Sequence, residues 1–331
     1  MAALRLAWLP AALVALAVLW WLPSRIDIAW QLDLSIILIL ALLALSMSFL
    51  WGFVGILSFG QTAFFGLGGY SYAVIALNAG STTWPALAAV LLAMLFAALL
   101  GYFMFYGRIS DVYLSVITLV VTLILDKAIR STSGPQYVIG KVRLNGQNGI
   151  PTVPSLRLPW NPAVELGIDQ ILQLAGLVLV LVYVGLKLLL LTRFGRVLVG
   201  IRENERRVEL LGYDSRAYKL GAWVISAGIA GLSGVLYATW GNFVAPEMFN
   251  LNQAAQVVIW VIVGGKSTLL GPILGTALVQ HLTAWLGTQG VGQVTLILGL
   301  VLMVFVLVFR EGLLPAILAL PGLFRRRRAD A

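Results

Sequence analysis

The sequence predicts an all-α fold, namely a polytopic helical membrane protein with about 8 to 10 transmembrane spans. Of the 331 residues, 60% are hydrophobic and only 11% are charged, whereas soluble globular chains carry about 25% charged residues. The 74 residues between Asp33 and Arg108 include no Asp, Glu, Lys or Arg. A single bilayer crossing takes about 20 residues, so this stretch must fold back across the membrane. Its continuous apolar character also favours helices over transmembrane strands, which alternate in polarity.

Glycine, proline and charged residues divide the apolar sequence into ten candidate spans. These are 4–22, 33–51, 54–78, 84–106, 109–130, 168–192, 218–240, 252–264, 268–287 and 291–309. Arg5, near the start of the first span, precedes an apolar run as in a signal sequence, but a clear cleavage site is missing, so we expect this span to be retained. The segment 252–264 is short for a crossing and 54–78 is rich in glycine, which is why the expected count is a range.

Lys and Arg fall unevenly on the two sides of the predicted bundle. Cytoplasmic loops carry the excess of these residues, and a cytoplasmic N-terminus places sixteen of the 22 on the inner side. The inner set is Arg5, Arg108, Lys187, Arg193, Arg196, Arg202, Arg206, Arg207, Arg216, Lys219, Lys266, Arg310 and Arg325 to Arg328. The outer set is Arg25, Lys127, Arg130, Lys141, Arg143 and Arg157. We therefore expect a single transmembrane domain over 1–331, with both termini and a basic tail at 310–331 in the cytoplasm.

The composition argues against several classes of function. The chain has no cysteine and one histidine, His281, so a thiolate or histidine metal cluster is not expected. The spans hold no carboxylate pair at helical spacing, which argues against a membrane-embedded enzyme. The net charge of +9 suits the acidic inner leaflet of a membrane and does not require a nucleic acid partner.

Two hydrophilic stretches interrupt the apolar pattern. The external loop 131–167 is rich in Pro, Gly and Asn, and is expected to form an ordered cap or docking surface. On the cytoplasmic side, the region 193–217 predicts a short amphipathic helix that can press against a partner. Its expected apolar face is formed by Val197, Ile201, Val208 and Leu211, and Gly212 is its predicted C-terminal stop.

The stretch GGKST, at 264–268, resembles a phosphate-binding loop but lacks a required glycine. Such a loop follows GxxxxGK[ST], and Trp260 stands where the first glycine belongs. The same stretch belongs to a glycine-broken segment at 263–275, and a second such segment lies at 52–70 in the other half of the chain. Interrupted segments in corresponding halves of a weak internal repeat are typical of a transport pathway. Close helix packing through small residues is the alternative explanation for each glycine.

Several polar residues fall inside or at the ends of the apolar runs. Gln61 lies in a glycine-broken segment and is the strongest functional candidate among them. For His281, and for its neighbour Gln280, an ordinary interhelical hydrogen bond is the simpler expectation. Asp126 and Arg130 are four residues apart, so they can pair on one helix face at the rim of a span.

Three motifs together resemble the permease subunits of branched-chain amino acid ATP-binding cassette (ABC) importers, most closely the larger of the two permeases, and also related urea importers. The motifs are GILSFGQTAFFGLGGY at 55–70, GRVLVGIRENERRVELLGYDSRAYKLGAWVISAGIAGLSGVLYA at 195–238, and VGGKSTLLGPILG at 263–275. This resemblance implies a second homologous permease, two cytosolic ATP-binding subunits and an extracytoplasmic solute-binding protein. It also implies that the partners bind ATP-Mg, and that this chain carries no ATPase site.

The resemblance implies that the helix that seats in the ATPase, called the coupling helix, includes Arg196, Ile201, Arg202, Glu203, Asn204, Glu205 and Gly212. The glycine-broken segments, with few buried charges, predict that the solute passes near Ser58, Phe59, Gly60, Gln61, Gly264 and Gly265. The sequence departs from the family pattern at Lys266 to Thr268, at Gln61, where histidine is frequent, and in the coupling helix at Arg207, Val208 and Leu210.

These observations predict a permease subunit that translocates branched-chain or related amino acids across the inner membrane. A permease for urea or short amides is an alternative, since the departures bear on the solute more than on the family. A secondary transporter that works without ATP is a further alternative, although such proteins usually place ionisable groups along an ion path, and the longest apolar runs here contain none.

Overall fold

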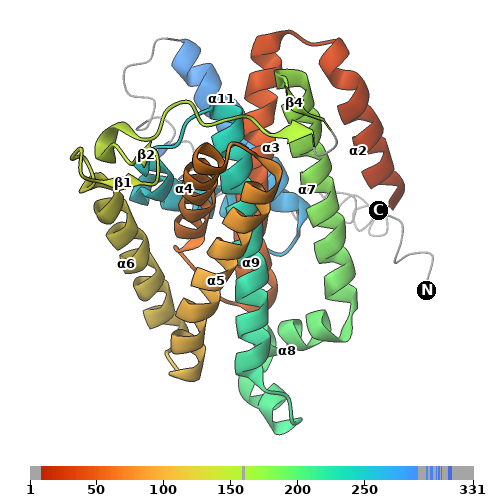
Figure 1. Ribbon diagram of the computed structural model, residues 1–331. Coiled ribbons are helices and arrows are strands. Elements are labelled where there is room, and N and C mark those ends of the chain that lie inside the picture. The colour runs from red at the N-terminus through yellow and green to blue at the C-terminus, as the bar shows by residue number, and fades with distance from the viewer. Residues whose placement is uncertain are drawn as a thin grey trace, which may run out of the picture.

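The computed structural model is a bundle of helices that are mostly aligned along one direction (Figure 1). It describes residues 9–158 and 161–289, together with 296, 299, 300, 303, 305, 307 and 312–314. The expected span at 291–309 and the basic tail at 310–331 therefore lie largely outside the described residues. The helices are α2 (Leu9–Trp21), α3 (Ile28–Ser48), α4 (Gln61–Ala79), α5 (Thr83–Tyr106), α6 (Asp111–Arg130), α7 (Ile168–Leu191), α8 (Arg193–Leu210), α9 (Ser215–Gly241), α10 (Leu251–Gly264) and α11 (Leu270–Thr288).

Five of the described helical segments are long and apolar enough to cross a bilayer. They are Ile28–Val54, Thr83–Tyr106, Asp111–Arg130, Ile168–Leu191 and Ser215–Gly241. The segment α10 has 14 residues, and at 1.5 Å per residue it reaches about 21 Å, which is less than the hydrocarbon core of about 30 Å. The fold class is therefore a polytopic helical membrane protein, as the sequence predicts.

The centre of the bundle is formed by α3, α4, α5 and α9, whose facing side chains are buried. Helices α4 and α9 approach closely because both carry glycine at their contact. A Cβ atom added to Gly68 would lie 2.7 Å from Gly231 Cα, and one added to Gly234 would lie 2.9 Å from Gly69 N. Small residues allow such backbone approach in membrane bundles, where shape complementarity drives helix association.

The expected single segment at 54–78 is divided in the structure. Helix α3 continues through a π-helical turn, η2 (Phe49–Val54), and a non-helical stretch at 55–60 precedes α4. The break begins at Gly55, whose φ of +89° closes the π-helical turn. Left-handed backbone of this kind favours glycine.

The two ends of the bundle differ in structure. One end carries α8 (Figure 1) and is called the α8 end below. The other end carries residues 131–167, which we call the cap. The cap contains two antiparallel hairpins, β1 (Val138–Ile139) with β2 (Val142–Arg143) and β3 (Arg157–Leu158) with β4 (Asn161–Glu165), and a helical turn, η3 (Gly146–Asn148). These short strands are the only described departure from the all-α prediction.

Candidate functional site

The non-helical stretch 55–60 lies against one face of α6. Ser115 Oγ donates to Leu57 O at 2.7 Å. Thr122 Oγ1 lies 3.2 Å from Phe59 O and 2.9 Å from Thr118 O, which is its closer acceptor. Thr118 Oγ1 accepts from Phe59 N, also at 3.2 Å. Hydroxyls three and four positions apart share a helix face, so α6 supplies partners that a broken helix lacks inside a bilayer.

The sequence analysis did not identify this hydroxyl face. Its signal is the spacing of Ser115, Thr118 and Thr122 within an otherwise apolar span. Two of the predicted pathway residues, Phe59 and Gly60, lie at this contact, and a Cβ added to Gly60 would lie 3.2 Å from Thr118 Cβ. Ser58 is buried and its Oγ accepts from Gly60 N at 3.0 Å within the stretch itself.

Gln61 begins α4 and is 1% exposed, between α3 and α9. Its Oε1 lies 3.1 Å from Ser46 Oγ and 3.4 Å from Ser226 Oγ. Both hydroxyls have closer acceptors, because Ser46 Oγ lies 2.6 Å from Leu43 O and Ser226 Oγ lies 2.7 Å from Ser46 O. Each hydroxyl has one proton. The amide orientation that gives both serine oxygens a donor therefore turns Nε2 toward them. Oε1 then takes the buried position that has no partner among the described residues.

The second predicted pathway segment is the turn between α10 and α11. Gly264 ends α10, and Gly265 has a φ of +102°. A Cβ added to Gly264 would lie within 2.7 Å of Pro272 N. The Thr268 hydroxyl caps the next helix by accepting from Gly271 N at 3.0 Å. The glycine at 264 thus permits close packing of the hairpin.

The two glycine-broken segments meet at the α8 end. The meeting point is Gly52 in η2, where an added Cβ would overlap the carbonyl of Lys266. Arg202 of α8 joins the same point, because its Nη1 donates to Gly52 O and its Cγ would lie 3.1 Å from a Cβ on Gly55. The Lys266 ammonium lies 5.0 Å from the ring centroid of Trp51. The structure therefore joins the segments through Gly52 and Lys266 rather than through 58–61 and 264–265.

Helix α8 is interrupted at Asn204, which the sequence analysis did not predict. Asn204 has non-helical angles, with φ −162° and ψ 96°, and its Oδ1 accepts from Arg207 N at 2.9 Å. This is the geometry of an N-cap, so Asn204 starts a second short helix. Gly212 follows the end of α8 with a φ of +87°, which confirms it as the stop. Leu211 is 72% exposed, so its assignment to the apolar face was wrong; the break at Asn204 changes the register of that face.

The second part of α8 is tied to α9 and to the start of α6. Lys219 Nζ lies 2.5 Å from Glu205 Oε2 and 3.9 Å from Asp111 Oδ1. The Lys219 side chain is only 11% exposed. Ser215 donates to Glu209 at 2.6 Å. These residues line a polar cavity of about 410 Å³ at the α8 end.

The remaining coupling-helix candidates all precede the break at Asn204. Arg202 pairs with the neighbouring Glu203, whereas Ile201 is buried against α9 in a small cluster with Val197 and Val208. Arg196 lies on the first turn of α8 and its Nε donates to Thr192 O at 3.4 Å.

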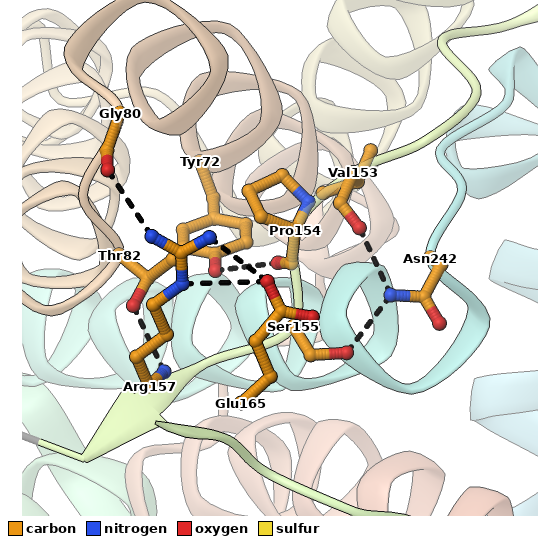
Figure 2. Close-up of polar contacts among 9 residues, drawn as sticks. All are labelled: Tyr72, Gly80, Thr82, Val153, Pro154, Ser155, Arg157, Glu165 and Asn242. Carbon is orange, nitrogen blue, oxygen red and sulfur yellow. Dashed lines mark hydrogen bonds and ion pairs between the residues drawn. The ribbon is translucent and has the colours of Figure 1, made fainter. Parts of the chain in front are cut away.

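The cap is fixed to the neighbouring helices by specific contacts (Figure 2). The Tyr72 hydroxyl of α4 donates to Pro154 O at 2.8 Å. Arg157 pairs with Glu165 across the second hairpin at 2.9 Å and also donates to Gly80 O at 3.3 Å. The cap is therefore ordered by contacts to α4 and to the α4–α5 turn.

A second set of contacts joins the cap to the end of α9 (Figure 2). Asn242 Nδ2 donates to Val153 O and to Ser155 Oγ, both at 2.9 Å. Ile150 and Val244 form an antiparallel bridge. Because these contacts are direct, a movement of α4 or α9 would displace the cap.

Three other polar residues singled out in the sequence lie toward the cap end. Arg130 binds Asp126 at 2.9 Å, which confirms the predicted pair, and it also binds Glu247 at 3.2 Å. Asp126 is 7% exposed, so the pair is more buried than a simple rim. His281 stacks on Trp30 of α3, with ring centroids 6.1 Å apart; within the described residues this ring contact replaces the hydrogen bond expected for it.

Comparison with known proteins supplies the family. The family described as "Branched-chain amino acid transport system / permease component" matches residues 34–307. The high-affinity branched-chain amino acid transport system permease protein LivM of Escherichia coli is 31% identical over 294 residues, which cover 81% of this chain and 65% of that protein. The LivM protein of Salmonella typhimurium is 29% identical over the same shares.

A shorter match extends the comparison to another transporter. The inner membrane ABC transporter permease protein YjfF of Escherichia coli is 29% identical over 138 residues, or 39% of this chain and 42% of that protein. No solved structure matches the chain. The chain spans 65% of the length of the two LivM relatives. The match over 34–307 takes in both glycine-broken segments and α8, and the chain therefore belongs to the branched-chain amino acid transport permease family.

Proposed function

We propose that this chain is the transmembrane permease subunit of an ABC importer that moves branched-chain or related amino acids across the bacterial inner membrane. The observation that carries this proposal is the family membership, together with relatives named as LivM permeases. In this proposal the chain is not an enzyme. Two cytosolic partners bind and hydrolyse ATP, a second homologous permease completes the pore, and a solute-binding protein docks on the cap.

The proposed orientation places the α8 end in the cytoplasm and the cap outside. The charge distribution supports it, because the 18 residues of α8 carry five arginines, whereas the longer cap carries three basic residues, Lys141, Arg143 and Arg157. Cytoplasmic segments carry the excess of Lys and Arg. Both termini are then cytoplasmic.

Within this proposal, α8 is the coupling helix and acts through two contacts. The first is Arg202, which holds the carbonyl of Gly52 at the π-helical turn. The second is Glu205, which binds Lys219, and Lys219 also lies near Asp111 at the start of α6. Since α6 holds the non-helical stretch 55–60, a displacement of α8 by the ATPase reaches the predicted pathway by both routes.

A charge exchange tests the second route. In the reconstituted importer, Glu205→Lys and Lys219→Glu should each lower leucine uptake per ATP hydrolysed, because each leaves like charges in contact. The double exchange should restore part of the loss, since groups in contact show interaction energies of about 0.5–3 kcal/mol, while the new carboxylate at position 219 then lies near Asp111. Asp169→Asn, in the first turn of α7 near the cap, is the matched control.

The outcome separates a coupling role from a merely structural one. If the single variants keep the wild-type ratio of solute moved to ATP hydrolysed, α8 does not couple the two processes through Lys219. Uptake of urea but not of leucine by the wild-type importer would instead select the alternative solute.

A further inference from the structure

A cavity of about 380 Å³ opens near the cap end of the bundle. Its wall comes from α3, α4, α9, α10 and α11, and from the turn η4 (Pro246–Phe249). It is lined by Ile36, Leu40, Phe65, Tyr237, Phe243, Ala245, Glu247, Met248, Gln253 and Gln280. The volume lies within the range of about 300–1,000 Å³ that is typical of small-molecule sites.

The lining combines an apolar wall with a few polar groups. Leu40, Phe65 and Met248 are buried at 5% exposure or less. The polar part of the lining consists of the Glu247 carboxylate, the amides of Gln253 and Gln280, and the Tyr237 hydroxyl. Ligand sites of this composition use the apolar surface for affinity and the polar groups for orientation.

The polar groups match the two charges of an α-amino acid. Glu247 already accepts a hydrogen bond from Arg130 through Oε1, and its carboxylate can also accept from an ammonium group. The amide N–H groups of Gln253 and Gln280 can donate to a carboxylate. The apolar wall would then receive a branched aliphatic side chain, a contact that urea could not make.

The cavity and the contacts of Gln61 involve the same three helices, α3, α4 and α9. Leu40 is six residues from Ser46 on α3, which is about 9 Å along the helix axis. Phe65 is about one turn from Gln61 on α4. Both residues are displaced toward the cap, because α3 runs from the cap end toward the α8 end and α4 runs back. The cavity therefore lies on the cap side of Gln61.

We infer that this cavity is an α-amino acid site on the permease itself, occupied after release from the binding protein and before passage beside Gln61. The inference rests on the proposed function and deepens it. Selectivity would then reside partly in this chain, because glycine and urea lack the side chain that the apolar wall receives.

Direct binding to the importer, without its binding protein, tests the inference. The complex is held in nanodiscs and saturated with radiolabelled leucine. Saturable binding is expected, with urea unable to compete. Gln280→Leu should weaken it about tenfold, the effect of losing one hydrogen bond to a charged group. Ala245→Phe should abolish binding by filling the cavity, whereas Ala128→Phe, on the exposed face of α6, should leave it unchanged.

Two results would overturn the inference. The first is that the wild-type importer takes up leucine when ATP and the binding protein are present, but shows no saturable leucine binding when the binding protein is absent. The other is unchanged leucine affinity in Gln280→Leu, or in Gln253→Leu if the first variant does not assemble. Failure of the proposed function is distinct, because the wild-type importer would then show no ATP-dependent leucine uptake at all.

Discussion

Replacement of Gly275 by alanine tests how tightly the α10–α11 hairpin is packed. Gly275 lies on α11 and faces α10, where an added Cβ would overlap the carbonyl of Trp260 and lie 2.7 Å from Gly264 N and 2.9 Å from Gly264 Cα. Ordinary contacts of a Cβ atom begin at about 3.4 Å. Because the obstructing atoms are backbone, the helices must separate to admit the methyl group.

The expected cost follows from this geometry. Overpacking of a close interface costs about 1–3 kcal/mol, and alanine recovers about 0.5–1 kcal/mol relative to glycine inside a helix. Gly185→Ala on α7 is the matched control, because no atom lies within 4 Å of its added Cβ. The control gains the same helix propensity without the clash. The difference in the free energy of unfolding between the two variants should therefore be about 1–3 kcal/mol.

The assay is thermal unfolding of the detergent-solubilised importer, followed by tryptophan fluorescence and by loss of the monodisperse peak in size-exclusion chromatography. Gly275→Ala should unfold at a lower temperature than the wild type, and Gly185→Ala at an equal or higher one. If Gly275→Ala is as stable as Gly185→Ala, the close approach of α10 and α11 is wrong. The packing explanation for this glycine would fall with it.

Three further predictions concern α6, the orientation and the cap. Thr118→Val keeps the shape of the side chain but removes the acceptor of the partly buried Phe59 N–H, so it should lower stability by about 0.5–1.5 kcal/mol. Thr118→Ser should restore most of the loss, and equal melting temperatures for all three proteins would contradict the contact. The chain has no native cysteine, so Lys141→Cys and Arg207→Cys can each be labelled as a single cysteine in intact spheroplasts. A membrane-impermeant maleimide should react with Lys141→Cys and not with Arg207→Cys. The opposite pattern would invert the proposed orientation. Tyr72→Phe removes the donor to Pro154 O, and should increase protease cleavage of the cap without abolishing assembly; unchanged cleavage would show that the cap does not depend on this bond.

The fold class and several helix ends could be predicted because they depend on local composition. Charge-free runs identify a membrane protein whatever its tertiary contacts. Gly212 could be predicted as a helix stop because only its own backbone conformation matters, and the Asp126–Arg130 pair because four residues on one helix fix the distance. Both are present in the structure.

The features that the sequence analysis missed depend on contacts between distant segments. In the sequence, nothing distinguishes Asn204 from an ordinary helical residue. Its role becomes visible only in the structure, where its side chain caps the next helical turn. The hydroxyls of α6 act as hydrogen-bond partners of the non-helical stretch 55–60, which lies more than 50 residues away in the chain. Likewise, the two glycine-broken segments could be paired from sequence as halves of a pathway, but their contact through Gly52 and Lys266 follows from the packing of η2.

The central claim is that this chain moves an amino acid only when cytosolic partners hydrolyse ATP. The most direct measurement is leucine uptake into proteoliposomes that contain the chain with its sister permease, both ATP-binding subunits and the solute-binding protein. The account predicts uptake that requires ATP together with the loaded binding protein, and that stops when the ATPases are inhibited by vanadate. Uptake by the chain alone, driven by an ion gradient without ATP, would contradict it.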